Sequence, residues 1–334
     1  MATPSRSAAS TVFVGVLLLV LGTVLSGCTT EPLDTGNAAA AKTSATLRNG
    51  PTTATLPTAD VVPIDTDATP GPHADRIIAI DRNGTLAAIV YALGLGPHVV
   101  GRDRSTTFPA AAQLPYVTET GHTINPERVL AQNPSIVLVT DDANPPGAVD
   151  QLRNTNVEVA VFTGERSMAT DSELIRSVAK TLGVPAAGEK LVARTEKQIE
   201  AARRQIPNPS GNPTIGFVYI RGPNLMLLGG PESGADDLIT ALGGVDAGTK
   251  AGMKAAFTQV SVESMARADP DVILVMTQGA DSVGGMDKVL ELPSIAATSA
   301  GRAGRVIEMD ETQILVFGPN TGLVLSALAK SIYA

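Results

Sequence analysis

The sequence has few of the side chains that build disulfide bonds, aromatic binding sites or multi-histidine metal sites. Its 334 residues include one cysteine, three histidines and no tryptophan. A single cysteine excludes an intramolecular disulfide and any site that needs two thiols. Aromatic residues make up only 3% of the chain, which disfavours a sugar-binding site, because sugars commonly stack on aromatic rings.

Motifs of common enzymes and of nucleic-acid-binding proteins are also missing. The chain contains neither a Gly-x-Ser-x-Gly nucleophile elbow nor a His-Glu-x-x-His zinc motif. Its formal net charge is -8 at pH 7, and it has no basic patch of the kind that binds nucleic acid. We therefore expect a binding protein and no enzyme. A secreted hydrolase or a passive wall lipoprotein is the alternative from another class.

The first 27 residues have the pattern of a bacterial lipoprotein signal peptide. Arg6 precedes an apolar run from Val12 to Leu25, which is too short for a membrane-spanning helix of about 20 residues. The run ends in Leu-Ser-Gly followed by Cys28, which looks like a lipobox. We therefore expect an acyl chain such as palmitate on Cys28, and a protein anchored to the extracytoplasmic face of the cell membrane.

Residues 28–73 predict a disordered tether. They are mostly Ala, Thr, Pro, Asp and Gly, with few large apolar side chains. Such a segment cannot bury enough apolar surface to offset the entropy lost on ordering.

The rest of the chain is typical of two folded α/β halves, because hydrophobic residues make up 43% of the sequence and charged residues 17%. A Glu-x6-Pro pattern starts at Glu127 and again at Glu263, and each copy precedes an apolar strand. Alternating strands and helices predict mainly parallel sheets. We expect two Rossmann-like lobes over residues 74–170 and 208–334, joined by a long helix within residues 171–207, with a ligand cleft between them.

Tyr219 and Arg221 end a strand of the second half and precede a Gly-Pro break. Residues two apart in a strand point to the same face, so the phenol and the guanidinium should project together while Ile220 turns away. A neighbouring cation favours the ionised phenol, and a phenolate oxygen suits ferric iron, including iron in a porphyrin. The alternative is a core tyrosine at the end of a strand.

Together, the lipobox, the tether, the two lobes, the linking helix and the repeated glutamates resemble the helix-linked class III substrate-binding proteins of ABC importers. The resemblance covers residues 74–334. Within that class the sequence is most similar to the haemin-binding lipoproteins of actinobacterial haem importers. The stretches that carry this likeness are residues 104–109 (Arg-Ser-Thr-Thr-Phe-Pro), 120–127 (Thr-Gly-His-Thr-Ile-Asn-Pro-Glu), 219–221 (Tyr-Ile-Arg) and 243–247 (Gly-Gly-Val-Asp-Ala).

The resemblance implies a role for each candidate site residue. His122 and Tyr219 would ligate the haem iron from opposite lobes, and Arg221 would bond to the tyrosine. Glu127 and Glu263 would dock the protein onto arginines of its permease. The alternative is that each glutamate only interacts favourably with the dipole of its own helix, because it lies in the first helical turn. Haem would then be a transported ligand and no catalytic cofactor.

The implied protein is a monomeric, lipid-anchored receptor that captures ferric haemin outside the cell and delivers it to the permease and ATPase subunits of an ABC importer for iron uptake. Haem-donating surface proteins are further candidate partners. A ferric siderophore or cobalamin receptor of the same class is the main alternative. A zinc or manganese receptor would need several converging His, Asp or Glu ligands, whereas only His98 and His122 lie beyond the tether.

Overall fold

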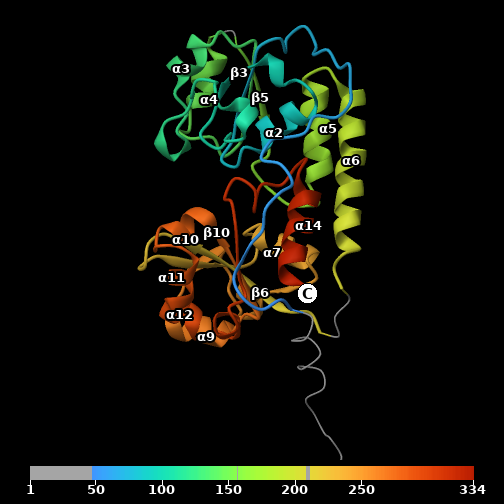
Figure 1. The fold of residues 1–334 in the computed structure, drawn as a ribbon. Helices are drawn as coiled ribbons and strands as arrows, with labels where there is room; N and C mark the ends of the chain where they lie inside the picture. The colour runs from blue at the N-terminus through green and yellow to red at the C-terminus, as the bar shows by residue number, and fades with distance from the viewer. Residues whose placement is uncertain (1–46, 156, 208–210) are drawn as a thin grey trace, which may run out of the picture. The chain divides into compact units, whose positions relative to one another are not determined.

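The computed structural model describes residues 47–155, 157–207 and 211–334 (Figure 1). The predicted signal peptide, Cys28 and the first part of the predicted tether lie outside the described residues.

A four-stranded parallel sheet with strand order β3-β2-β4-β5 forms the first half. The two central strands are continuous apolar runs, Ile-Ile-Ala-Ile and Ile-Val-Leu-Val-Thr, and every residue in them is buried. Such runs are typical of parallel strands that are covered on both faces. The elements are β2 (Ile77–Ile80), α2 (Thr85–Ala92), β3 (Val99–Arg102), α3 (Pro126–Ala131), β4 (Ile136–Thr140), α4 (Ala148–Arg153) and β5 (Glu158–Phe162), with 3-10 turns η1 (Gly96–His98), η2 (Pro109–Ala111) and η3 (Thr120–His122).

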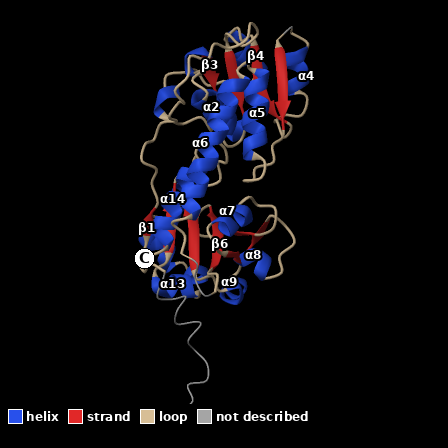
Figure 2. Ribbon diagram, turned by 90° about the vertical axis from the view of Figure 1, so that its right-hand side faces the viewer, coloured by secondary structure: helices blue, strands red, loops and turns tan. Residues whose placement is uncertain are grey.

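A seven-stranded sheet forms the second half, with order β1-β11-β10-β6-β7-β9 and β8 beside β6. Its pairs are parallel except those that β7 makes with β6 and β9. Figure 2 shows helices flanking the strands of each sheet. The strands are β1 (Thr52–Thr53), β6 (Thr214–Ile220), β7 (Met226–Gly229), β8 (Val245–Asp246), β9 (Phe257–Gln259), β10 (Val272–Met276) and β11 (Val306–Met309). The helices are α7 (Ala235–Ala241), α8 (Ala247–Lys250), α9 (Val262–Ala268), α10 (Thr277–Asp281), α11 (Met286–Glu291), α12 (Pro293–Ala296), α13 (Ser299–Ala303) and α14 (Thr321–Ile332).

Two helices connect the sheets, α5 (Asp171–Thr181) and the long α6 (Pro185–Arg203). The break between them falls where Gly183 adopts a left-handed φ of 78° and Pro185 opens the next helix. Helix α6 packs against both α5 and α14 (Figure 1). The contact with α14 is close, because a Cβ on Gly322 would lie 2.5 Å from the backbone of Gln198. The predicted α/β architecture with a long connecting helix is confirmed.

The prediction of a disordered tether is wrong for residues 47–73. Strand β1 adds in parallel to the edge of β11, and the Ala54 N–H donates to the Glu308 carbonyl at 2.8 Å. Further along, the Ile64 N–H donates to the carbonyl of Ala92 at 2.8 Å. The segment has few apolar side chains of its own, but distant elements supply the hydrogen-bond partners and the apolar surface that order it.

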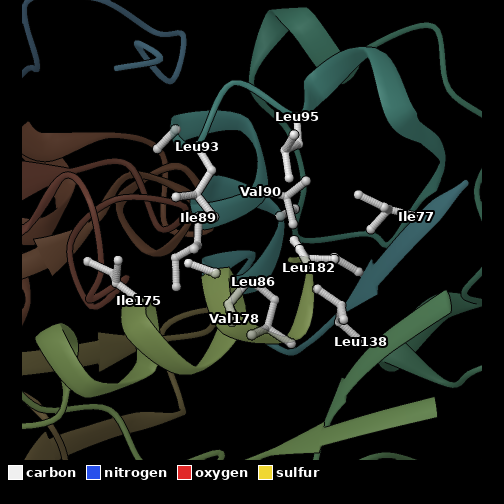
Figure 3. Packing of buried hydrophobic residues seen from close by; sticks show 14 of the residues in the cluster. Ile77, Leu86, Ile89, Val90, Leu93, Leu95, Leu138, Ile175, Val178 and Leu182 are labelled. Carbon is white, nitrogen blue, oxygen red and sulfur yellow. The ribbon is translucent and has the colours of Figure 1, made fainter. Parts of the chain in front are cut away.

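The core of the first half surrounds α2, which contributes side chains on nearly all of its sides (Figure 3). A helix that is apolar all round is a buried helix. It packs between the sheet and α5, and burial of each leucine or isoleucine contributes roughly 1.5–3 kcal/mol. This packing fixes the loop between β2 and α2, which reaches the candidate site. The packed residues include Ile77, Leu86, Ile89, Val90, Leu93, Leu95, Leu138, Ile175, Val178 and Leu182.

Candidate functional site

A cleft of about 880 Å³ lies at the carboxyl ends of strands from both sheets. Asn83 follows β2, residues 164–167 follow β5, Met276 ends β10, and Glu311 and residues 315–317 follow β11. Residues 232–234, in the loop between the antiparallel strand β7 and helix α7, also line the cleft. Ligands of open α/β folds collect at such strand ends. The volume lies in the range of roughly 300–1,000 Å³ that is usual for sites of small molecules and cofactors.

Acidic side chains line one wall of this cleft, and several of them hold backbone amides in place. Asp236 accepts from the N–H of Glu232 at 2.9 Å, and Asp237 accepts from the N–H of Met168 at 2.6 Å. Both aspartates lie in the first turn of α7, where the helix dipole favours a negative charge. These carboxylates therefore organise the walls of the cleft.

Arg166 supplies a buried cation to the same cleft. Its side chain is only 7% exposed and lies 3.3 Å from the carboxylate of Asp81, and it donates to the carbonyl of Thr163 at 2.7 Å. Asp81 also accepts from backbone N–H groups at the start of α2, including that of Leu86 at 2.8 Å. Sequence reasoning missed this pair. A signal existed only for Asp81, an aspartate between a strand and a helix start.

His122 ends the 3-10 turn η3 with a left-handed φ of 61°, a conformation that is uncommon for a non-glycine residue. Its Nδ1 lies 3.0 Å from Oγ of Ser105. Burial lowers the pKa of His122 and the charge of Arg82 lowers it further, against an opposing effect of Asp81. The lowered pKa favours the neutral imidazole, which is the form that can ligate a metal.

Beneath the loop that carries Ser105 lies a second buried carboxyl group, Asp103. It accepts from the N–H of Asp81 at 2.8 Å and from the N–H of Thr106 at 2.7 Å. Burial raises the pKa of Asp103 to about 7, with a further increase from the charge of Asp81. These bonds fix the course of the backbone on both sides of Ser105.

Tyr219 lies near the carboxyl end of β6 and is half-buried. It packs on the core that contains Phe217, whereas Ile220 belongs to the core on the other face of the sheet. In the register that pairs Val218 with Val275, Tyr219 stands beside Met276 of β10, which lines the cleft. Among the described residues, the Tyr219 hydroxyl has no hydrogen-bond partner, which leaves this oxygen available to a ligand.

Arg221 lies just beyond β6 in the turn before β7 and is exposed. Its N–H donates to the carbonyl of Leu225 at 2.9 Å. Within the part of the chain that the structure describes, no hydrogen bond joins its guanidinium to Tyr219. His122 lines a small pocket with Arg82 and Asp142. Tyr219 lines neither this pocket nor the cleft of about 880 Å³.

Glu127 and Glu263 occupy equivalent places in the two halves. Each is exposed, each is the second residue of its helix, and each helix, α3 or α9, leads into a buried strand. The preceding caps are also alike, because the side chains of Asn125 and Ser261 each accept a backbone N–H three residues on. The repeat seen in the sequence is thus a repeat of structure.

Residues 47–155, 157–207 and 211–334 contain neither a cluster of metal-ligating side chains nor a membrane-spanning helix. No group of three or more His, Cys, Asp or Glu side chains is placed to hold a metal ion. No helix in these ranges is long and apolar enough to cross a membrane.

The fold and the cleft at the strand ends are those of a two-lobed substrate-binding protein. Residues 82–312 match the model of the periplasmic binding protein family, and the chain belongs to this family. The proteins of this family act as the substrate-binding components of ABC transporters and are not enzymes.

Two solved haem-binding proteins and one cobalamin-binding protein are similar to this chain. The crystal structure of the haem-binding protein HmuT matches with 32% identity and a TM-score of 0.78, over 86% of this chain and 98% of that one. The periplasmic haem-binding protein RhuT from Roseiflexus sp. RS-1 matches with 36% identity and a TM-score of 0.71, over 77% and 97%. A cobalamin-binding protein of Halobacterium salinarum is 26% identical over 289 residues, 84% of this chain and 74% of the relative.

Proposed function

We propose that this protein captures ferric haem outside the cell and delivers it to an ABC importer, with the iron held between His122 and Tyr219. The observation that carries this proposal is a shared set of residues. Solved variants of HmuT replace a histidine, a tyrosine and an arginine two residues after that tyrosine with alanine. Arg221 follows Tyr219 by the same interval, and the histidine precedes the tyrosine by nearly the same number of residues in both chains.

The local chemistry of His122 and Tyr219 supports the same assignment. A neutral imidazole provides an axial nitrogen, and Tyr219 provides an oxygen with no competing hydrogen bond among the described residues. Arg221 is the candidate cation for keeping the phenolate ionised in the loaded protein. The two ligands belong to different halves, so haem would have to bridge the halves.

Delivery requires a surface that recognises the importer. Glu127 and Glu263 are two exposed carboxylates at equivalent helix starts, and charges placed in this way steer association with a pseudo-symmetric partner. We assign them to docking on the permease.

We also assign Cys28 as the lipid attachment site. Replacing Cys28 with serine should move the protein from the membrane fraction to the medium.

Haemin titration of the mature protein tests the ligation. The wild type should show a Soret shift that saturates at one haemin per chain, and His122→Ala and Tyr219→Phe should each weaken binding and change the spectrum. The matched controls, His98→Ala and Tyr91→Phe, remove the same groups elsewhere and should leave both unchanged. Haemin binding that is equal in all five proteins would exclude this pair as the ligands.

A cobalamin receptor is the second candidate, because the Halobacterium salinarum relative is a cobalamin-binding protein. Calorimetric titration with cyanocobalamin separates the two functions. Tight cobalamin binding without a haemin-induced Soret shift would replace the haem proposal. The haem proposal predicts the opposite pattern.

A further inference from the structure

The hydrogen bonds of Ser105 determine which ring nitrogen of His122 carries the proton. Ser105 is only 8% exposed. Its hydroxyl lies 2.6 Å from the carbonyl oxygen of Arg82 and 3.0 Å from Nδ1 of His122. A carbonyl oxygen can only accept, so the single hydroxyl proton of Ser105 goes to Arg82. The serine oxygen must then accept a hydrogen bond from the Nδ1–H group of His122.

We propose that Ser105 is a positioning residue that holds His122 in its Nδ1–H tautomer and leaves Nε2 unprotonated as the nitrogen that ligates iron. The tautomer follows from the hydrogen bonds alone, whereas the ligation by Nε2 rests on the proposed function. Metal-ligating histidines characteristically donate their other N–H to a fixed acceptor, which sets the ring orientation and raises the basicity of the ligating nitrogen.

The serine itself is held from both sides. The N–H of Arg104 donates to the Thr118 hydroxyl at 3.0 Å, and the N–H of Thr106 donates to the buried carboxyl of Asp103 at 2.7 Å. Gly84, which has a left-handed φ of 79°, lies so close that a Cβ there would be 2.7 Å from the carbonyl oxygen of Ser105. The acceptor is therefore in place before any ligand arrives, which is the preorganisation that a metal ligand requires.

The carbonyl that takes the hydroxyl proton of Ser105 belongs to Arg82. Arg82 is itself paired with Asp142 at 3.2 Å. In a neutral histidine side chain in water the proton prefers Nε2, so an Nδ1–H ring has to be selected by its surroundings, and Ser105 is the acceptor that selects it.

The first arm of the test needs no haem. Nitrogen-15 NMR of the histidine rings in the apo protein should show the Nδ1–H tautomer for His122. Ser105→Ala should shift His122 toward the Nε2–H form, while Ser177→Ala, the same change on α5, should have no effect. An Nε2–H ring in the wild type, or no change in Ser105→Ala, would overturn the tautomer assignment.

The second arm measures haemin affinity and the iron–histidine vibration. Loss of a group that orients a metal ligand typically costs about 10–100-fold in metal affinity, so Ser105→Ala should bind haemin that much more weakly with a shifted vibration. Ser105→Thr retains the hydroxyl and should bind like the wild type, and thermal melting verifies that both variants fold.

The outcomes of the second arm are separable from failure of the haem proposal. Unchanged affinity and vibration in Ser105→Ala would overturn the role of Ser105 in ligation while haem binding stands. A wild type with the predicted tautomer but no haemin binding would overturn the ligation by Nε2 together with the proposed function, and only the tautomer assignment would survive. A folded Ser105→Thr that binds as weakly as Ser105→Ala would overturn the role of the hydroxyl.

Discussion

Asp171 makes the stability of the protein depend on pH in a direction that can be worked out from the structure. It is the first residue of α5 and accepts from the hydroxyl of Thr321, the first residue of α14, at 2.6 Å. Burial raises the pKa of Asp171 from 3.8 to about 7, and Asp237 raises it further, although hydrogen bonds from Thr321 and Gly318 and the charge of Arg166 oppose the increase. At pH 8 the folded protein must therefore keep a buried carboxylate charged.

The sign of the effect follows from proton binding. Between pH 3.8 and about 7, folded Asp171 retains a proton that the unfolded chain has lost, so stability falls as pH rises across this interval. A shift of about three units corresponds to at most about 4 kcal/mol, and we expect about 2–4 kcal/mol after local relaxation. Asp171→Asn removes this titration and can still accept from Thr321.

The assay is thermal melting of the wild type and of Asp171→Asn from pH 3.5 to 8.5. At about 2 °C per kcal/mol for a chain of this size, the variant should melt about 4–8 °C above the wild type at pH 8 and at nearly the same temperature at pH 3.5. Asp103 titrates in both proteins, so the difference between them isolates Asp171. The exposed Asp65→Asn is the control and should show no such trend. A difference that does not vary with pH, or a variant less stable at pH 8, would contradict a raised pKa of Asp171.

Two further predictions concern docking and packing. Replacing both Glu127 and Glu263 by alanine should slow association with the importer about tenfold at low salt, without changing haemin affinity. Surface plasmon resonance measures the association rate. Equal rates for this variant and a Glu158→Ala control would contradict the docking role. The buried Tyr333 donates to the carbonyl of Leu242 at 2.6 Å, and burial raises its pKa to about 12. Tyr333→Phe should cost about 1–2 kcal/mol and lower the melting temperature by about 2–4 °C, and an unchanged melting temperature would show that this bond is not stabilising.

Elements with a strong local signal were predictable from the sequence. The apolar strands expected after the two Glu-x6-Pro patterns are β4 and β10, because burial on both faces of a parallel strand leaves a continuous apolar pattern. Strand β5 was missed because its five residues are partly exposed and begin with Glu158. Strand β1 was missed because its partner β11 is remote, as in the pair Thr53 and Glu308, which are 255 residues apart.

The residues of the candidate site also differ in whether the sequence alone could suggest them. His122 and Tyr219 could be named from the sequence because their residue types suit iron and lie in recognisable stretches. The groups that orient and bury them could not, because Ser105 reaches His122, and Arg166 reaches Asp81, only in the folded chain. Ordinary serines and arginines carry no local signal for such contacts, so the sequence could suggest candidate ligands but not the residues that contact them.

We propose that iron is ligated by a tyrosinate from one half of the protein and an imidazole from the other. Resonance Raman spectroscopy of the haemin-loaded protein tests this most directly, because an iron-bound phenolate contributes vibrations of its own. Ligation by Tyr219 predicts phenolate modes in the wild type that disappear in Tyr219→Phe and persist in Tyr91→Phe. A haemin-loaded wild type without these modes, or modes that survive in Tyr219→Phe, would contradict it.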